Sequence, residues 1–110
     1  MEGNVERTAA AELFKTLGNE SRLALLLLLR DDARTVSSLV AESGLSQPLV
    51  SQHLRTLRGA GLVSSHREGR EVEYRLADHH VLHVISDALF HVTEPAALHS
   101  DRPEEEGEER

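Results

Sequence analysis

Apolar residues recur at helical spacing through the first sixty positions of this chain and then alternate with polar residues over a short stretch. Spacings of three and four residues are typical of amphipathic helices. One segment, "ESRLALLLLLR", is apolar on all sides, which predicts that it lies at the centre of the domain. We expect helices over residues 5–17, 20–30, 35–44 and 46–58.

A β-hairpin and a last helix are predicted after the change of period. The segments "LVSSHR" (62–67) and "VEYRL" (72–76) have period-two character, and "EGR" between them supplies a glycine for the turn. The last helix is expected to begin at Asp78 and to be limited by Pro95.

The order of these elements, α-α-α-α-β-β-α, indicates a mainly α fold with a small β-hairpin. Two helices joined by a short turn and followed by a hairpin make a winged helix-turn-helix. We divide the chain into a flexible N-terminus (1–7), a winged helix-turn-helix domain for DNA binding and dimerisation (8–94) and an acidic disordered tail (95–110). The tail contains Pro103 and a run of glutamates, a composition that does not form a packed core.

Composition and charge narrow the function. The chain has no cysteine, which excludes disulfides and thiolate metal sites. Its net charge is −7, but the last ten residues account for −4 of it, whereas residues 46–75 carry +2. A weakly basic middle is compatible with DNA binding. There is neither a secretory signal nor an apolar run of membrane length, so we expect a cytoplasmic protein without a membrane partner.

The helix over residues 46–58 has the properties of a DNA-recognition helix. Val50, Leu54 and Leu57 form an inward stripe, and polar groups that can pair with base edges in the major groove face away from it. His53, beside the stripe, is expected to pack or to hydrogen-bond. The alternative, an ordinary amphipathic surface helix, fits less well with the arginine-bearing hairpin that follows. The predicted DNA-binding residues are Ser46, Gln47, Ser51, Gln52, Arg55, Arg67 and Arg70.

Three stretches together resemble the ArsR/SmtB family of small dimeric winged-helix regulators over about residues 8–94. They are "LFKTLGNESRLALLLLL", "SQPLVSQHLRTLRGAGLV" and "REGREVEYRL". The resemblance implies a homodimer formed through the first and last helices, which binds an imperfect palindrome in double-stranded DNA. It also implies an inducer, usually a metal ion, that changes the affinity for this operator.

The predicted last helix carries histidines near both ends of an apolar seam. The seam consists of Val81, Ile85, Ala88 and Val92. His80 and His91 lie on nearly the same side of the helix but about 16 Å apart along its axis, whereas metal–nitrogen bonds are about 2 Å long. One chain therefore cannot bring both to one ion. An antiparallel partner helix can, because the start of one helix then faces the end of the other.

The expected metal ligands are two residues from each subunit. Asp78 and His80 of one chain would meet His91 and Glu94 of its partner, giving two sites per dimer. This pattern resembles the last-helix interfacial metal site of the ArsR/SmtB family. The segment in which other members carry a cysteine-rich metal site reads "TVSSLVAES" here, so we expect that second site to be absent.

The identity of the metal stays open between nickel and zinc. Four nitrogen and oxygen ligands suit tetrahedral zinc, whereas nickel(II), or cobalt(II), with a higher coordination number would need further donors. Additional donor candidates are His79, His83 and His99, although the first two also fit a solvated helix face.

We therefore expect a metal-responsive, DNA-binding transcriptional regulator. The family resemblance implies a repressor, whereas the residues themselves do not distinguish a repressor from an activator. The alternative is a winged-helix regulator without a metal effector, controlled by an unidentified protein partner. An enzyme is not expected, because the chain has no H-E-x-x-H motif and no paired nucleophile and histidine. The sequence leaves open the metal, its coordination number, the operator, the target genes, the role of the tail and the sign of the metal effect.

Overall fold

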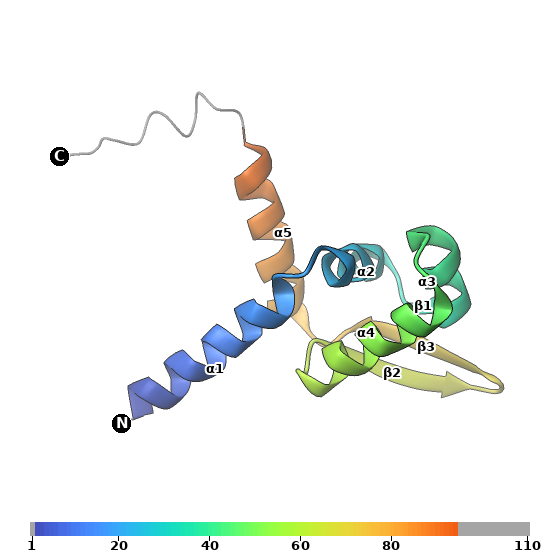
Figure 1. The fold of residues 1–110 in the computed structure, drawn as a ribbon, viewed down its shortest axis with the longest axis horizontal. Coiled ribbons are helices and arrows are strands. Elements are labelled where there is room, and N and C mark those ends of the chain that lie inside the picture. The colour runs from blue at the N-terminus through green and yellow to red at the C-terminus, as the bar shows by residue number, and fades with distance from the viewer. Residues whose placement is uncertain (1, 95–110) are drawn as a thin grey trace.

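The structure is a computed structural model that describes residues 2–94. The elements are α1 (Glu2–Leu17), α2 (Glu20–Asp31), β1 (Arg34–Thr35), α3 (Val36–Ser43), α4 (Gln47–Gly59), β2 (Val63–Glu68), β3 (Glu71–Leu76) and α5 (His79–Thr93). The described residues form five helices and a small three-stranded sheet: α2, α3 and α4 gather at the sheet, α1 and α5 extend away from it, and the hairpin projects from beneath the fourth helix (Figure 1). The predicted winged helix-turn-helix is confirmed.

Side-chain caps set where the central helices begin. An N-cap oxygen accepts a hydrogen bond from a backbone N–H that the first helical turn leaves without a partner. Asn19 accepts from the N–H of Arg22 at 2.9 Å, and Ser46 accepts from that of Leu49 at 3.3 Å. Gly44 ends α3 in the left-handed region at φ 77°, which glycine adopts without steric cost. These starts and stops agree with the sequence-based boundaries to within about two residues.

The core lies between α2, α3, α4 and the base of the hairpin. Leu25 and Leu26 of α2 are fully buried, as expected for a helix that is apolar on all sides. Leu39 of the neighbouring α3 is fully buried as well. The other buried apolar residues are Leu17, Leu29, Val50, Leu54, Leu57, Leu62, Val63, Val81 and Ile85.

The sheet contains one strand that the sequence does not predict. β1 has only two residues, too few for an alternating pattern to be recognised, and it pairs with β3 through Arg34↔Tyr74 and Thr35↔Glu73. The strand order is β1-β3-β2, antiparallel throughout. Thr35 is both the last residue of β1 and the N-cap of α3, since its hydroxyl accepts from the N–H of Ser38 at 3.1 Å.

The first helix differs from the sequence-based expectation. α1 begins at Glu2, so residues 2–7, expected to be a flexible N-terminus, are helical. That expectation relied on the spacing of apolar residues, which becomes regular only further along the helix. From Gly3 to Glu12 every residue is exposed, and α1 runs away from the body of the domain (Figure 1). The predicted acidic tail, 95–110, lies outside the described residues.

The outline of the described chain is long rather than spherical. Its radius of gyration is 17.1 Å, compared with about 13 Å for a compact domain of this size. The two helices at the ends of the chain therefore have more surface than the body of one subunit covers. No helix within residues 2–94 is long and apolar enough to cross a membrane.

Candidate nucleic-acid interface and metal centre

α4 is held by one face and presents the other to solvent. Val50, Leu54 and Leu57 are at most 1% exposed and dock the helix against the core, as the sequence predicts. Pro48 lies in the first turn, where a missing N–H costs no helical hydrogen bond. The helix is thus fixed in position while its opposite face remains accessible.

The predicted base-contacting residues lie mostly on that accessible face. Gln47, Gln52 and Arg55 are exposed, and Ser51 is half-buried. Ser46 is exposed, and its hydroxyl oxygen accepts the hydrogen bond that caps α4. The O–H group can still donate a hydrogen bond to a ligand. Amides and guanidinium groups at the N-terminal part of such a helix are the groups that read base edges in the major groove.

The β2–β3 hairpin, or wing, is exposed at its tip and has two different faces. Gly69, at φ 64°, and Arg70 form the two-residue turn, and Arg67 pairs across the strands with Val72. Side chains alternate between faces along a strand, so this face of the wing carries Arg67 and no carboxylate.

The opposite face of the wing is acidic. Glu68 pairs with Glu71 and His66 pairs with Glu73, which places three carboxylates on one side. His66 Nε2 lies 3.6 Å from a Glu68 oxygen. Sequence reasoning singled out the arginines and missed these carboxylates, although the alternation in "HREGREVE" would have revealed them. The acidic face must point away from phosphate if the wing contacts DNA.

Two of the four predicted metal ligands, Asp78 and His80, lie close together at the start of α5. Asp78 caps the helix by accepting from the N–H of Val81 at 3.0 Å, and the same oxygen lies 3.7 Å from His80 Nδ1. Both side chains are accessible, His80 at 94% and Asp78 at 54%. Both side chains are therefore accessible to solvent at the same end of the helix.

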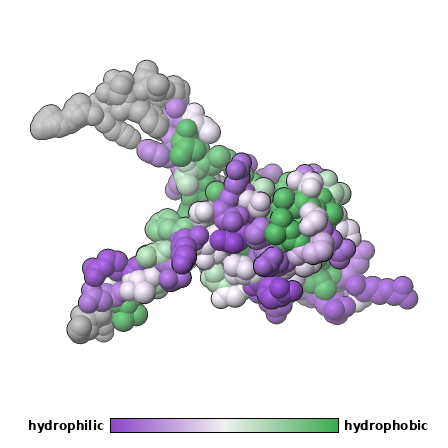
Figure 2. All heavy atoms as spheres, viewed as in Figure 1, coloured by the Kyte–Doolittle hydropathy of each residue, from purple (hydrophilic) through white to green (hydrophobic). Residues whose placement is uncertain are grey.

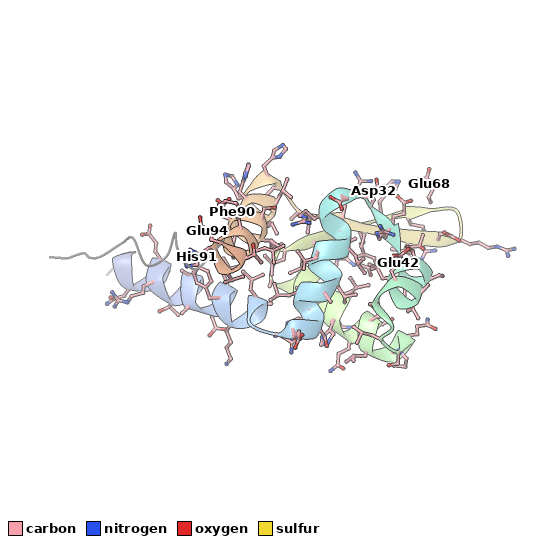
Figure 3. The ribbon with its side chains drawn as sticks, turned by 90° about the horizontal axis from the view of Figure 1, so that it is seen from above. Asp32, Glu42, Glu68, Phe90, His91 and Glu94 are labelled. Atoms are coloured by element: carbon pink, nitrogen blue, oxygen red, sulfur yellow. The ribbon has the colours of Figure 1, made fainter. Side chains whose placement is uncertain are left out.

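The other two predicted ligands lie at the end of the same helix. Figure 3 shows Phe90, His91 and Glu94 on the last turns of α5. Glu94 is the C-cap, and its N–H donates to the carbonyl of His91. Within one copy of residues 2–94 no three histidines or carboxylates gather into a metal-holding group.

The predicted seam of α5 is divided between two roles. Val81 and Ile85 are buried in the core of their own chain, at 9% and 4% exposure, whereas Ala88 and Val92 are exposed. The prediction of a continuous seam for a partner helix is therefore wrong at its first two positions. Periodicity could not show this, because a residue at a helix–helix contact looks the same whichever chain supplies the other helix.

An apolar cavity of about 320 Å³ opens beside the exposed half of this helix. Residues of α1, α2 and α5 line it, among them Phe14, Leu27 and Leu89. Figure 2 shows hydrophobic side chains gathered along α5 and where it meets α1. Phe14, Phe90 and Val92 are each more than 60% exposed. Large exposed apolar side chains beside an apolar cavity mark a surface that a partner covers.

The sequence also suggested His79, His83 and His99 as additional donors. His79 and His83 are exposed on α5. His99 lies outside the described residues.

His53 is the buried polar side chain of α4. It is 8% exposed, and its Nδ1 has no hydrogen-bond partner among residues 2–94. Burial lowers the pKa of His53 below its ordinary value of 6.5, and the positive charge of Arg22 lowers this pKa further. The folded protein therefore favours a neutral imidazole at this position.

The lowered pKa of His53 predicts how acid affects stability. Below about pH 6.5 the unfolded chain takes up a proton that the folded chain resists, so the free energy of unfolding decreases as the pH decreases. The stability that neutral His53 contributes is fully present above about pH 6.5, and it is lost as the pH falls through the pKa of His53 in the folded protein. Urea unfolding of metal-free protein between about pH 7.5 and about pH 5, at one protein concentration, measures it.

Two variants separate His53 from the other histidines in that experiment. His53→Asn removes the titrating group and should lose part of the acid destabilisation, whereas His66→Gln on the exposed wing should retain it. Equal pH dependence in the wild type and His53→Asn would contradict the assignment.

Comparison with known proteins identifies the family. The profile of the family described as "Bacterial regulatory protein, arsR family" matches residues 19–65, from the cap of α2 into β2. The HTH-type transcriptional regulator NmtR of Mycobacterium tuberculosis is 38% identical over 90 residues, which cover 79% of this chain and 75% of NmtR. The chain belongs to the ArsR family. The ArsR/SmtB resemblance of the three sequence stretches is thereby confirmed.

Two further relatives of this ArsR-family chain are informative. The HTH-type transcriptional repressor SmtB of M. tuberculosis is 50% identical over 88 residues, which cover 80% of the chain but 65% of SmtB. The solution structure of a homodimeric winged helix-turn-helix DNA-binding domain from Mycobacterium bovis superposes with a TM-score of 0.81 at 27% identity, covering 91% of this chain and 92% of that one. These relatives are named as regulators, in agreement with the prediction of a regulator rather than an enzyme.

Proposed function

We propose that this ArsR-family chain is a homodimeric transcriptional repressor whose affinity for operator DNA responds to nickel or zinc bound between the α5 helices. The observation that carries the proposal is the pairing of two features on one small domain. A docked α4 presents amides and a guanidinium to solvent, and both ends of α5 present a carboxylate beside a histidine.

Binding to double-stranded DNA is supported by how α4 and the wing are built. Gln47, Gln52 and Arg55 project from a helix whose other face is immobilised in the core. Arg67 and Arg70 at the wing can reach phosphates, which position the protein on the duplex while base contacts specify the sequence. The acidic tail accounts for over half of the net charge, so the negative charge of the whole chain does not argue against DNA binding by α4 and the wing.

Dimerisation through α1 and α5 is supported by the surface these helices leave uncovered. The apolar cavity between α1, α2 and α5, together with Phe14, Phe90 and Val92, requires a cover in water. A second copy of the chain supplies an apolar surface of matching chemistry. A symmetric dimer can then bind the two halves of a palindrome, which lie one helical turn of DNA apart.

The donor set at α5 fits a divalent transition metal. Imidazole nitrogen and carboxylate oxygen without sulfur suit zinc or nickel, with cobalt as a close substitute. Asp78 and His80 from one subunit, with His91 and Glu94 from its partner, would hold the ion. When bound, the ion supplies a cross-link between subunits.

The position of the first half-site suggests how it affects DNA binding. Asp78 and His80 line a shallow pocket of about 160 Å³ together with Ala60 and Gly61, which end the recognition helix. Reorientation of α5 at this point therefore acts on the end of α4. We expect the metal-bound arrangement to release the operator, with a coupling free energy of about 1–3 kcal/mol, or about 5- to 150-fold in affinity.

Cobalt(II) titration of the full chain tests this proposal. Visible absorption should saturate at one ion per subunit, with intense bands for a four-coordinate site and weak bands for higher coordination. His91→Ala should abolish the bands, and His66→Ala on the exposed wing, away from α5, is the control that should retain them. A duplex selected from a random library by the wild-type protein, followed by fluorescence anisotropy, measures operator affinity with and without zinc or nickel.

The possible results separate the two parts of the proposal. If the wild-type protein selects no sequence, the assignment as a DNA-binding regulator is wrong. If it selects one but His91→Ala leaves metal binding unchanged, the α5 site is wrong, and the alternative of a regulator controlled by a protein partner takes its place.

A further inference from the structure

A groove of about 310 Å³ lies between the recognition helix and the wing. α4 lies next to the base of the hairpin, so that residues of both elements reach this groove (Figure 1). Its lining residues are Val36, Ser51, Leu54, Arg55, Arg58 and Tyr74. Two of them carry guanidinium groups, two carry hydroxyl groups, and none is acidic.

The two arginines give this groove a positive charge. Arg55 and Arg58 are three residues apart on α4, so they are neighbours on the surface of that helix. Both side chains are exposed, and within residues 2–94 neither forms an ion pair with a carboxylate. A groove with two unpaired guanidinium groups and no carboxylate in its lining suits an anion, and guanidinium groups match the oxygens of phosphate in particular.

Tyr74 forms the wing side of the groove. It is half-buried and packs against the core, which holds its ring in place. It pairs with Ser65 of β2 and lies two residues from Val72, the partner of Arg67. Side chains alternate between faces along a strand, so Tyr74 shares the face of the wing that carries Arg67. The carboxylate of the adjacent Glu73 belongs to the opposite, acidic face.

We propose that this groove binds one phosphate group of the DNA backbone, held by the guanidinium of Arg58 and the hydroxyl of Tyr74. The proposal rests on the function proposed above. Base edges are read by residues in the N-terminal part of a recognition helix, whereas Arg58 lies in the last turn of α4. Arg58 therefore positions the protein on one DNA strand, which passes between α4 and the wing, while residues nearer the start of α4 read the sequence.

A purely structural role of Arg58 makes a different prediction. A cation in the last turn of a helix interacts favourably with the negative end of the helix dipole. If that were its whole role, loss of the charge would lower the Tm without changing the number of counterions that DNA releases on binding. The salt dependence of DNA affinity therefore separates the two roles, because its slope counts the phosphates that the protein neutralises.

The test is Arg58→Gln in the metal-free full chain, measured by fluorescence anisotropy at several salt concentrations. Each neutralised phosphate contributes about −0.9 to the slope of log affinity against log salt. A dimer has two such grooves, so the slope should become shallower by about two. At physiological salt the affinity should fall by about tenfold, to the same extent for the duplex that the wild type selects and for a scrambled duplex.

Arg75→Gln is the matched control for this measurement. Arg75 follows Tyr74 on β3, so its exposed side chain lies on the opposite face of the wing. The substitution removes the same charge from the adjacent position and should leave the slope unchanged.

Two further variants test the wing side of the groove and the division of roles along α4. Tyr74→Phe keeps the ring that packs against the core but removes the hydroxyl. It should weaken binding to both duplexes by about threefold without changing the salt slope, because no charge is lost. Gln52→Ala, in contrast, should weaken binding to the selected duplex and leave the scrambled duplex within about twofold of the wild type.

An unchanged salt slope in Arg58→Gln would overturn the proposal, as would an equal change of slope in Arg75→Gln. Calorimetric titration of the DNA-free protein with inorganic phosphate tests the other source of the same chemistry. Phosphate binding that Arg58→Gln abolishes, together with an unchanged salt slope, would assign the groove to a free anion instead of DNA. If the wild type does not distinguish the selected duplex from the scrambled one, it is the proposed function that fails.

Discussion

Mixing two variants that have each lost metal binding is expected to restore it. In the proposed dimer one site takes Asp78 and His80 from the first subunit and His91 and Glu94 from the second, and the symmetric site takes the reverse. A dimer of His80→Ala has two incomplete sites, as does a dimer of His91→Ala. In the mixed dimer both substitutions fall in the same site, so the other site has all four ligands.

Heterodimers purified through two different affinity tags allow a direct measurement. We expect one cobalt(II) ion per heterodimer by visible absorption, and no specific binding to either variant homodimer. A heterodimer of two differently tagged His80→Ala copies is the matched control and should stay empty. If the mixed dimer binds no better than this control, the ligands do not come from opposite ends of two helices. The 3.7 Å pairing of His80 with Asp78 would then have no role in metal binding.

Replacing Leu54 with alanine is expected to lower the free energy of unfolding by about 2–5 kcal/mol, the usual range for a buried leucine. Leu54 is 1% exposed at the centre of the face that docks α4. The substitution leaves a cavity between α4 and the core, and the domain's stability is of the order of 5–15 kcal/mol. Urea unfolding at one protein concentration measures the change, since the midpoint for a dimer depends on concentration.

Thr56→Ala is a suitable control for this prediction, because Thr56 is exposed on the same helix as Leu54. Its effect should stay within about 0.5 kcal/mol, as for most surface substitutions. The same pair of variants tests recognition, since looser docking of α4 should also weaken operator binding. A loss below about 1 kcal/mol for Leu54→Ala would mean that α4 is held mainly by other contacts.

Local chemistry made much of the fold predictable. Ser46, Thr35 and Gly44 each perform the capping or terminating role that their residue types predict. Gly69 lies where a hairpin turn needs a positive φ. These signals depend on a few neighbouring residues, so they can be read directly from the sequence. The helices, the wing and the docking stripe of α4 could therefore be predicted together with their approximate boundaries.

Features that depend on distant contacts could not be predicted. β1 exists because Arg34 and Thr35 lie beside β3, and two residues carry no pattern of their own. Val81 and Ile85 pack into their own chain, whereas Val92 on the same seam remains exposed. The pairing of Asp78 with His80 could be predicted, since both lie at one helix start. The effect of the Arg22 charge on the pKa of His53 could not, because 31 positions separate the two residues in the sequence.

Thr35 makes the DNA-reading unit difficult to transplant. The same residue pairs with Glu73 of the wing and caps α3, the first helix of the helix-turn-helix. An engineer who grafts α3 and α4 onto another scaffold without β3 removes the strand that holds this cap in place. Deletion of one residue at the start of α3, directly after Thr35, would move the cap out of register in the same way. A graft of α3 and α4 must therefore carry β1 and β3 with it.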